Sequence, residues 1–302
     1  MTTRAPDAAA SWPAYLLLAF TALCWGGNAV FGRLAVGEVS PMALVTLRWL
    51  GALGLLVVFA HARVRRDWPA IRQRLPFVAA MGAVGFTAFN ALFYVAAHST
   101  TAINIGIIQG SIPVFVLLGA FAAFRARVSG LQVAGVLVTM LGVAIVASGG
   151  QLARLATLAL NLGDVLMIAA CLLYAGYTLG LSRRPPVSPL SLFIAMAAIA
   201  FATSLPLALA EAALGTFQWP TPFGWLVIAL VTLFPSFLAQ ICFIQGVSLI
   251  GPSRAGVFVN LVPVFASILA LVVLKEPFEP YHASALGLVL GGIWLSERGK
   301  AA

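Results

Sequence analysis

Charged residues are scarce in this sequence. Asp, Glu, Lys and Arg make up 8% of the 302 residues, whereas hydrophobic residues make up 62%. About a quarter of the residues of a soluble domain are charged, and a soluble fold of this length needs many more charged side chains on its surface. The composition therefore excludes water-soluble classes and predicts an all-α polytopic membrane protein.

Cysteine is also rare. Cys24, Cys171 and Cys242 each fall inside an apolar run, with no close pair that could chelate a metal or form a disulfide framework. We therefore interpret them as packing residues and expect neither a metal site nor a cofactor.

Sequence motifs of intramembrane enzymes are missing as well. There is no His-Glu-x-x-His zinc helix and no Gly-x-Ser-x-Gly elbow. The spacing from His61 to Asp67 is one residue too long for the His-x4-Asp motif of acyltransferases. We therefore expect that the protein is not an enzyme, and an intramembrane lipid-modifying enzyme is the alternative from another functional class.

Long apolar runs account for most of the chain. About 20 apolar residues cross a hydrocarbon core of about 30 Å. The first run shows no small-x-small cleavage site, so we interpret it as a membrane helix rather than a cleaved signal. We predict ten transmembrane helices, over residues 14–35, 41–61, 76–97, 101–124, 130–149, 162–182, 189–210, 222–249, 252–274 and 281–297.

Basic residues follow this division into helices. With the N-terminus inside, the opposite side of the membrane holds only Arg33, Arg154 and Lys275, and Arg48 lies within the second helix. This asymmetry predicts a bacterial inner-membrane protein with cytoplasmic N- and C-termini. The net charge of +9 forms no continuous stripe with interleaved aromatics, so we expect no nucleic-acid partner. Thirteen of the 17 Lys and Arg residues fall on the cytoplasmic side: Arg4, Arg63, Arg65, Arg66, Arg72, Arg74, Arg125, Arg127, Arg183, Arg184, Arg254, Arg298 and Lys300.

The two halves of the sequence resemble each other. A shift of 150 positions lays the segment 106–115 over 256–265, with Gly, Pro, Val and Phe coinciding, and places Asn90 over Gln240. We predict two five-helix repeats, residues 1–150 and 151–302. Because five is odd, the second repeat is inverted in the membrane, a recurring plan of secondary transporters with a site near the midplane. Chance similarity between apolar helices is the alternative.

Several short motifs resemble those of one transporter family. The run Leu23-Cys24-Trp25-Gly26-Gly27-Asn28, followed by Ser40-Pro41 and Leu47-Arg48-Trp49, resembles the opening of the EamA family in the drug/metabolite transporter (DMT) superfamily. The run from Pro263-Val264-Phe265 to Leu274-Lys275-Glu276-Pro277 is similar to the end of an EamA unit. The first copy departs from this pattern, because Arg125-Ala126-Arg127 replaces the acidic turn.

Within the family, the sequence is most similar to the YddG-type amino-acid exporters. This resemblance implies ten helices, cytoplasmic termini and export of amino acids, notably aromatic ones, through a central pathway. The same motifs occur in exporters of quite different metabolites, so export of another small metabolite or drug is the alternative. A passive channel is a third possibility, although no charged rings indicate ion selectivity. We expect a small-molecule substrate and the lipid bilayer as partners, and a monomer or weak homo-oligomer.

Polar side chains inside the predicted helices are candidates for substrate contact, because they are costly in a bilayer unless paired or hydrated. Phe86, Asn90 and Tyr94 recur at intervals of four and share one helix face, as do Ser236 and Gln240. The amides of Asn90 and Gln240 suit the backbone of a zwitterionic amino acid, since they donate and accept hydrogen bonds. Hydrogen bonding between helices is the alternative.

Aromatic residues provide a second set of candidates. Trp25 and Asn28 are three apart on the first helix, as are Tyr174 and Tyr177 on the sixth, and we predict that both pairs line a cavity. A place in an interfacial belt is the alternative for Trp25. We expect interfacial positions for four other tryptophans: Trp12, Trp49, Trp219 and Trp294.

Two prolines occupy matching positions in the fourth and ninth helices. Pro113 and Pro263 each remove a backbone hydrogen bond and bend the axis. Matching interruptions in both halves point toward a substrate path, and Gln109 and Asn260 lie close to the prolines. A kink used only for packing is the alternative.

Arg48 is the only Lys or Arg more than one turn from either end of a predicted helix. It either attracts a substrate carboxylate, or it snorkels outward or binds neighbouring carbonyls, and we favour the second interpretation. Asp164, Glu211 and Glu276 all lie near helix ends, which favours facilitated efflux over a buried acidic proton relay. His98 or His282 at the rim is the alternative route for proton coupling.

Overall fold

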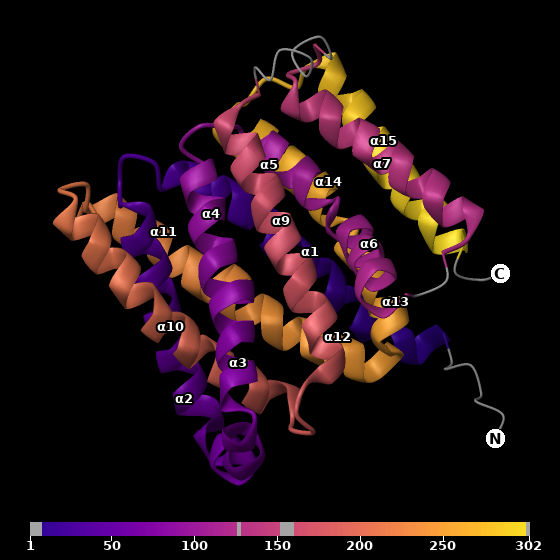
Figure 1. Cartoon of the computed structure of the whole chain (residues 1–302). Helices are drawn as coiled ribbons and strands as arrows, with labels where there is room; N and C mark the ends of the chain where they lie inside the picture. Colours follow the sequence, from indigo (N-terminus) through magenta and orange to yellow (C-terminus); the bar gives the residue numbers. More distant parts are fainter. Residues whose placement is uncertain (1–7, 126–127, 152–159, 300–302) are drawn as a thin grey trace, which may run out of the picture.

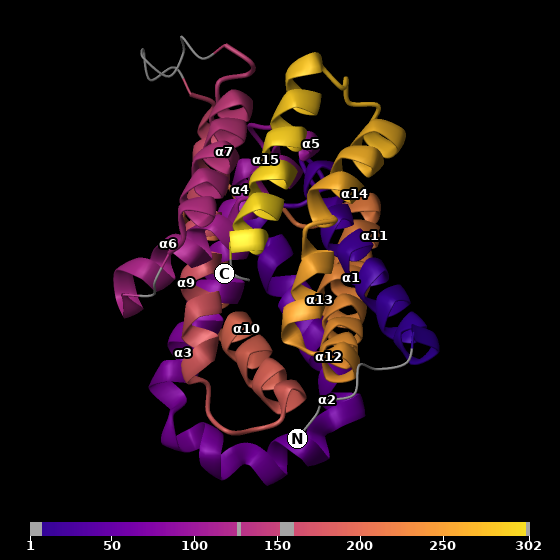
Figure 2. The ribbon, with the colours of Figure 1, turned by 90° about the vertical axis from the view of Figure 1, so that its right-hand side faces the viewer.

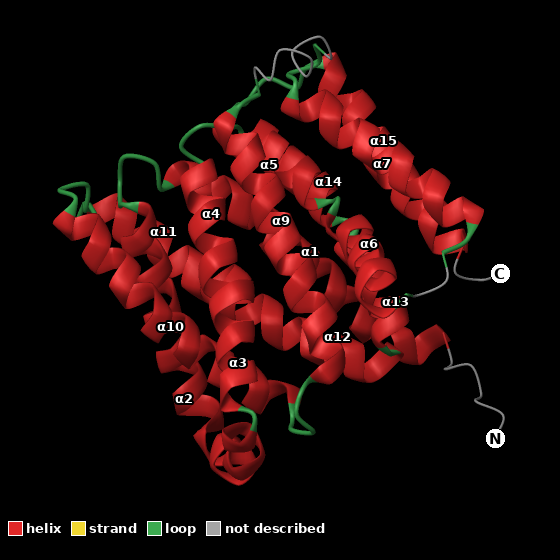
Figure 3. Ribbon diagram, in the orientation of Figure 1, coloured by secondary structure: helices red, strands yellow, loops and turns green. Residues whose placement is uncertain are grey.

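Helices make up most of the described part of the chain, and loops and turns connect them (Figure 3). The computed structural model describes residues 8–125, 128–151 and 160–299, and no strand occurs in these ranges (Figure 3). The predicted all-α class is therefore confirmed. The longer helices are α1 (Ala8–Leu34), α2 (Pro41–Gln73), α6 (Ile112–Phe124), α7 (Gly130–Ala147), α9 (Leu162–Gly180), α10 (Pro189–Ala213), α11 (Pro222–Val231), α12 (Ala239–Ile250) and α15 (Pro280–Arg298). The shorter ones are α3 (Leu75–Gly82), η1 (Ala83–Ala88), α4 (Phe89–Ala96), α5 (Ala102–Gln109), η2 (Leu181–Arg183), η3 (Thr232–Leu238), α13 (Pro252–Val259), α14 (Val262–Leu269) and η4 (Ala270–Leu274).

Nine helical segments among the described residues are long and apolar enough to cross a membrane. They coincide with the first nine predicted runs. The tenth run forms α15, but this helix of 19 residues is not one of the nine, because polar residues at its ends dilute its apolar middle. A count of ten spanning helices therefore stays a prediction.

The outer surface of the bundle is apolar. Leu16, Leu137 and Leu209 are between 65% and 70% exposed, although each lies in the middle or latter part of a long helix. Exposed leucines at such density are unsuited to water and fit contact with lipid tails. The described residues thus form a multi-pass membrane protein.

Helix α2 is longer than its apolar run. The prediction ended it at residue 61, whereas the helix continues to Gln73 through the cluster Arg63, Arg65 and Arg66. Hydropathy marks the end of the membrane span, but arginine is a good helix former, so the helix itself continues. The turn between α2 and α3 lies at the same end of the molecule as the start of α1 and the end of α15 (Figure 1).

The fourth and ninth predicted helices are broken rather than kinked. Helix α5 ends at Gln109 and α6 begins at Ile112; likewise α13 ends at Val259 and α14 begins at Val262. Pro113 and Pro263 each occupy the second position of the new helix, where a missing N–H breaks no bond and the fixed φ suits a helix start.

The third and eighth predicted helices also carry matching irregularities. Each contains a π-helical segment, η1 (Ala83–Ala88) in the first half and η3 (Thr232–Leu238) in the second. A shift of 150 residues brings the two segments into register. Wide π turns leave carbonyl groups free for other partners and are frequent at functional sites.

Helix packing follows the same relation between the halves. Helix α1 packs on α12 and α14, α9 packs on α4 and α6, and α2 packs on α10. Helices α7 and α15 run side by side at one edge of the bundle (Figures 1 and 2). Exchanging the halves maps the two contacts of α1 onto the two contacts of α9, and maps the α2–α10 and α7–α15 contacts onto themselves, as an inverted repeat predicts. The division at residue 150 stays a prediction.

The closest approach of α7 and α15 is at glycines. A Cβ on Gly135 would lie 2.5 Å from the carbonyl oxygen of Gly292, and a Cβ on Gly292 would lie 2.6 Å from that of Gly135. The 150-residue shift converts this pair into Ala285 and Gly142, which also meet, with a Cβ on Gly142 2.8 Å from the oxygen of Ala285. The interface has no room for a larger side chain at these positions.

Gly292→Leu is therefore expected to destabilise the protein. Overpacking of this kind costs about 1–3 kcal/mol, which lowers the melting temperature by roughly 5 °C in a chain of this size. Thermal unfolding of the purified protein in detergent measures the shift. Gly291→Leu is the matched control, because no atom lies within 4 Å of a Cβ built there. Equal melting temperatures for the two variants would contradict this account of the interface.

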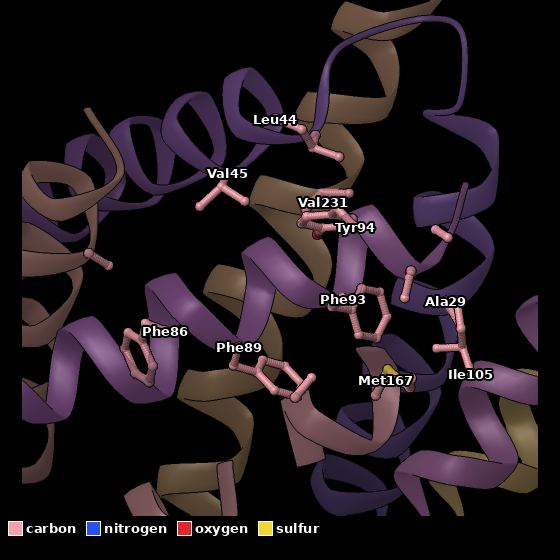
Figure 4. Close-up of a cluster of buried hydrophobic side chains, with 14 of the residues drawn as sticks. Ala29, Leu44, Val45, Phe86, Phe89, Phe93, Tyr94, Ile105, Met167 and Val231 are labelled. Carbon is pink, nitrogen blue, oxygen red and sulfur yellow. The ribbon is translucent and has the colours of Figure 1, made fainter. Parts of the chain in front are cut away.

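The buried core is centred on the third predicted helix. Phe86, Phe89, Phe93 and Tyr94 lie on η1 and α4 in the buried cluster that Figure 4 shows, and α2, α9 and α10 pack against these two segments. Each of these side chains is less than 10% exposed. This arrangement fixes η1 and α4 as the rigid wall on which the central site is built.

Candidate functional site

A cavity of about 90 Å³ lies at the centre of the bundle and is lined by residues of both halves. The π segments η1 and η3 and the two helix breaks all open onto it. The structure brings nine of the predicted residues together in its wall: Trp25, Asn28, Phe86, Asn90, Gln109, Pro113, Tyr174, Gln240 and Asn260. Their predicted role in binding substrate stays a prediction.

Three predicted residues lie outside the cavity wall. Tyr94 is buried behind it at 2% exposure. Tyr177 supports the wall, with its ring centroid 5.6 Å from that of Phe86 and 5.2 Å from that of Tyr174. Pro263 packs against the helix before the first break, where a Cβ on Gly110 would lie 3.2 Å from its ring.

Arg48 lines the cavity and does not snorkel outward. Its side chain is 4% exposed. Nε donates a hydrogen bond to Ser236 Oγ at 2.9 Å, and Nη1 donates to Asn90 Oδ1 at 2.6 Å and to the hydroxyl of Tyr94. The favoured prediction is therefore wrong. The reason is geometric: Arg48 is near the middle of the span Pro41–Val58 and faces the bundle.

Each acceptor around Arg48 donates to a further group. The Tyr94 hydroxyl donates to Asn28 Oδ1 at 2.9 Å, Ser236 Oγ donates to the carbonyl oxygen of Val231 at 2.7 Å, and Asn90 Nδ2 donates to the carbonyl oxygen of Phe86. These bonds fix the direction of every donor in the network. Nη2 of Arg48 forms no hydrogen bond with any described residue, so its N–H groups remain available at the cavity.

Trp49 is also a wall residue rather than part of an interfacial belt. It is 2% exposed and stacks on Phe86, with 4.7 Å between ring centroids and 3° between ring planes. Its Nε1 is buried without a hydrogen-bond partner in the described chain. The interfacial prediction for Trp49 is wrong because α2 starts at Pro41, which places Trp49 two turns inside the helix. Trp12, Trp219 and Trp294 are 65%, 70% and 55% exposed, as a belt requires.

Other polar side chains in the wall have no hydrogen-bond partner among the described residues. Gln109 Oε1 is buried without a partner, and the side chains of Gln240 and Asn260 form no hydrogen bond with described residues. Aromatic rings complete the wall, among them Phe89 and Tyr174, whose centroids are 4.9 Å apart. The site can therefore hold a small molecule that combines an anionic or polar group with an apolar one.

The cavity is small in this conformation. An apolar cavity of about 150 Å³ holds one benzene ring, and the central cavity measures about 90 Å³. A substrate with an aromatic side chain thus requires the halves to move apart.

The end of the molecule opposite the turn between α2 and α3 is closed by carboxylates that bridge the halves. Glu276 accepts hydrogen bonds from the backbone N–H groups of Ala102 at 2.9 Å and Ile103 at 3.1 Å, in the first turn of α5. Arg33 Nε lies 3.9 Å from the same carboxylate. Anionic groups at a helix N-terminus are stabilising. We call Glu276 with α5 the outer clasp.

Glu211 forms a similar bridge at this end. Its carboxylate accepts from Ser40 Oγ at 2.7 Å and from the N–H groups of Met42 and Ala43 at 3.3 Å each, at the start of α2. Both carboxylates come from the second half and cap helices of the first. They hold the halves together at this end.

A polar outer cavity of about 370 Å³ adjoins the clasp. Asp164, 1% exposed, accepts from Thr100 Oγ1 and from Asn104 Nδ2 at 3.2 Å, and Asn104 Oδ1 lies 3.2 Å from His282 Nε2. His98 also lines this cavity, and burial together with nearby Arg33 lowers its pKa, against a smaller opposing effect of Glu211. Neither histidine lines the central cavity, so proton coupling through them stays a hypothesis.

No cluster of three or more His, Cys, Asp and Glu side chains that could hold a metal occurs in the ranges that the structure describes. Cys24, Cys171 and Cys242 are free thiols, the first two buried in the bundle.

Tyr94→Phe is expected to lower stability without changing the shape of the site. It leaves one Arg48 N–H and Asn28 Oδ1 without their shared partner, which costs about 1–3 kcal/mol. Thermal unfolding measures the effect. Tyr174→Phe is the control, because the Tyr174 hydroxyl forms no hydrogen bond with the described residues. A Tyr94→Phe variant as stable as this control would refute the network.

A helical membrane bundle with a polar cavity enclosed between two similarly built halves is the architecture of a membrane transporter. The profile of the EamA-like transporter family matches residues 12–148 and, a second time, residues 161–298. The chain belongs to this family, in the DMT superfamily, and is a multi-pass membrane transporter of that type.

Curated relatives agree with this assignment. The chain is 28% identical to the uncharacterized transporter YetK of Bacillus subtilis over 94% of this chain and 86% of YetK. It is 25% identical to the uncharacterized transporter YyaM of the same organism over 92% of each chain, and 27% identical to an uncharacterized transporter of Archaeoglobus fulgidus over 93% of this chain and 96% of that one. A crystal structure of a protein 19% identical in sequence superposes with a TM-score of 0.63 over 95% of this chain and 97% of that one, which shows a shared fold.

Proposed function

We propose that the protein is a YddG-type exporter of amino acids, with aromatic and other neutral ones favoured. The observation that carries this proposal is the central cavity, in which a buried guanidinium with unused N–H groups and unpaired amides face aromatic rings. The carboxylate and amino groups of an amino acid suit the polar wall, and its side chain suits the rings. Facilitated efflux down a concentration gradient is the simplest mechanism, because it needs no proton-coupling side chain in the cavity.

Transport then proceeds by alternating access, in which the repeats 1–150 and 151–302 rock around the central cavity. The protein resides in the bacterial inner membrane with both termini in the cytoplasm, as a monomer or weak homo-oligomer. In this orientation the outer clasp faces away from the cytoplasm.

The opposite end of the molecule also carries contacts between the halves. Asp67 of α2 accepts a hydrogen bond at 3.0 Å from the backbone N–H of Ser188, which precedes α10, and Arg74 Nη1 donates to the carbonyl oxygen of Arg183 at 3.0 Å. The 150-residue shift places Glu276 over Ala126, so the sequence does not repeat the outer clasp itself at that end.

Flux in reconstituted liposomes tests the proposal. The substrates are labelled phenylalanine, tryptophan, threonine and glutamate, and the test variant is Asn90→Ala with Gln240→Ala, whose amides line the cavity. We expect saturable flux of phenylalanine and tryptophan that this folded variant loses. The double variant Gln73→Ala with Gln151→Ala removes two exposed amides and should transport normally. Absence of flux for all four amino acids would overturn the proposal and favour another metabolite.

A further inference from the structure

The charge of the central cavity is unbalanced. Among the described residues, Arg48 is the only Lys, Arg, Asp, Glu or His side chain in its wall. The carboxylates in the described part of the chain lie at helix ends or in connections, and the clasp and outer cavity already engage Glu211, Glu276 and Asp164. The site thus presents one positive charge with no protein counter-ion.

The partners of Arg48 are all neutral. Ser236, Asn90 and Tyr94 satisfy Nε and Nη1 but supply no negative charge, and Nη2 is left without a described partner. A buried cation without a counter-ion is unfavourable in a bilayer. A guanidinium in this state is a receptor for a carboxylate, because charge and donor geometry match.

Trp49 adds an independent observation in the same wall. Its ring lies 5.1 Å from Cζ of Arg48, it is 2% exposed, and its Nε1 N–H has no hydrogen-bond partner among the described residues. An indole N–H is a donor only. Arg48 therefore offers an unused donor at the cavity, and Trp49 holds a second unused donor beside it that is covered in this conformation; neither side chain offers a hydrogen-bond acceptor, which suits an anionic oxygen.

Among the described residues of the wall, an ammonium group finds hydrogen-bond acceptors but no negatively charged side chain. The amide oxygens of Gln109, Gln240 and Asn260 can accept hydrogen bonds but carry no charge, and Arg48 repels a cation in the same small cavity. A ligand with a carboxylate and no ammonium brings the total charge of the occupied site to zero. A zwitterion has no net charge, so the occupied site keeps the positive charge of the empty site.

We propose that the central site selects its substrate by the carboxylate alone, and that it takes aromatic or apolar monocarboxylates that lack an amino group. This inference rests on the proposed transport site and deepens it. Phenylalanine is then bound through the features that it shares with 3-phenylpropionate. Its ammonium contributes nothing to affinity.

Binding to the purified full-length protein in detergent tests the inference, because a carboxylic acid in its neutral form crosses liposome membranes unaided. Calorimetry compares four probes: phenylalanine, 3-phenylpropionate, phenethylamine and 3-phenylpropionamide. We expect 3-phenylpropionate to bind at least as tightly as phenylalanine. The amine and the amide, which lack a carboxylate, should bind at least 100-fold more weakly.

Variants at the two donors sharpen the test. Arg48→Gln should weaken 3-phenylpropionate binding at least 100-fold, and Trp49→Phe, which keeps a ring and removes the N–H, about tenfold. Arg72→Gln removes an exposed charge on the same helix and should bind as the wild type does. If Arg48→Gln does not fold, Trp49→Phe and the four-probe comparison still decide the question.

The outcomes separate this inference from the proposed function. Phenylalanine binding tenfold or more tighter than 3-phenylpropionate would overturn the inference and leave amino-acid export standing. Binding of 3-phenylpropionate without phenylalanine would support the inference and contradict amino-acid export. Absence of 3-phenylpropionate binding contradicts the inference whatever phenylalanine does.

Discussion

Arg48→Gln is expected to reduce saturable flux of phenylalanine in liposomes at least about 100-fold. The substitution removes the buried charge that faces the cavity and leaves Asn90, Ser236 and Tyr94 without their donor. Losing one partner of a buried, hydrogen-bonded charge pair costs about 2–5 kcal/mol, and each 1.4 kcal/mol is a factor of ten. Initial rates over a range of phenylalanine concentrations measure the loss.

Two controls identify the cause of this loss. Arg48→Lys keeps the charge but not the planar fork, so it should recover part of the flux. Arg72→Gln removes a charge from the exposed end of α2 and should transport as the wild type does. Wild-type flux in a folded Arg48→Gln protein would exclude Arg48 from the transport site.

Glu276→Gln is expected to open the end of the protein that the outer clasp closes. The substitution removes the charge from two hydrogen bonds to the N-terminus of α5 and from the pair with Arg33. Charged hydrogen bonds contribute about 1.5–3 kcal/mol each, so the open population should rise at least about tenfold. The readout is the labelling of an Ile112→Cys reporter, which lines the cavity, by an impermeant thiol reagent added outside.

Glu279, the control position for this prediction, lies with Glu276 in the segment between η4 and α15. Glu279→Gln removes an equal charge beside the start of α15, where the Glu279 N–H pairs with His282 of its own half. We expect no change in the labelling rate, measured in a background in which Cys24, Cys171 and Cys242 are replaced. A labelling rate in Glu276→Gln no higher than in Glu279→Gln would show that the clasp does not hold the outer end closed.

The positions of the helices were largely predictable from the sequence. Apolar runs mark the spans because lipid demands them, and Pro113 and Pro263 lie just after the breaks, where proline suits the first turn of a new helix. The π segments were not predicted. They follow from packing around Gly85 and Pro235, which the 150-residue shift matches but which carry no recognised local signal.

The centre of the site was predicted only in part. The amides and rings from both halves lie around one cavity, as the match between positions of the two halves predicted. Arg48 and Trp49 were misassigned, since a long basic side chain and a tryptophan are usually placed by the interface. Their distance from Pro41, at the start of α2, was the signal that could have corrected both assignments.

The contacts between the halves could not be read from the sequence. Glu276 was recognisable in the sequence because its motif resembles the end of an EamA unit. Its partners, the N–H groups of Ala102 and Ile103, lie more than 170 residues away in the chain. A carboxylate near a helix end looks the same in sequence whether it caps its own helix or another. Only the packing of the halves makes Glu276 a clasp.

In the proposed mechanism, substrate passes through the cavity around Arg48. Asn260→Trp tests it most directly, because Asn260 lines the cavity, makes no side-chain hydrogen bond with described residues, and would fill the roughly 90 Å³ with an indole ring. Val257→Trp, at a 54% exposed position on α13, is the matched control. We predict that Asn260→Trp folds and loses saturable phenylalanine flux while Val257→Trp keeps it. Wild-type flux in Asn260→Trp would contradict the claim.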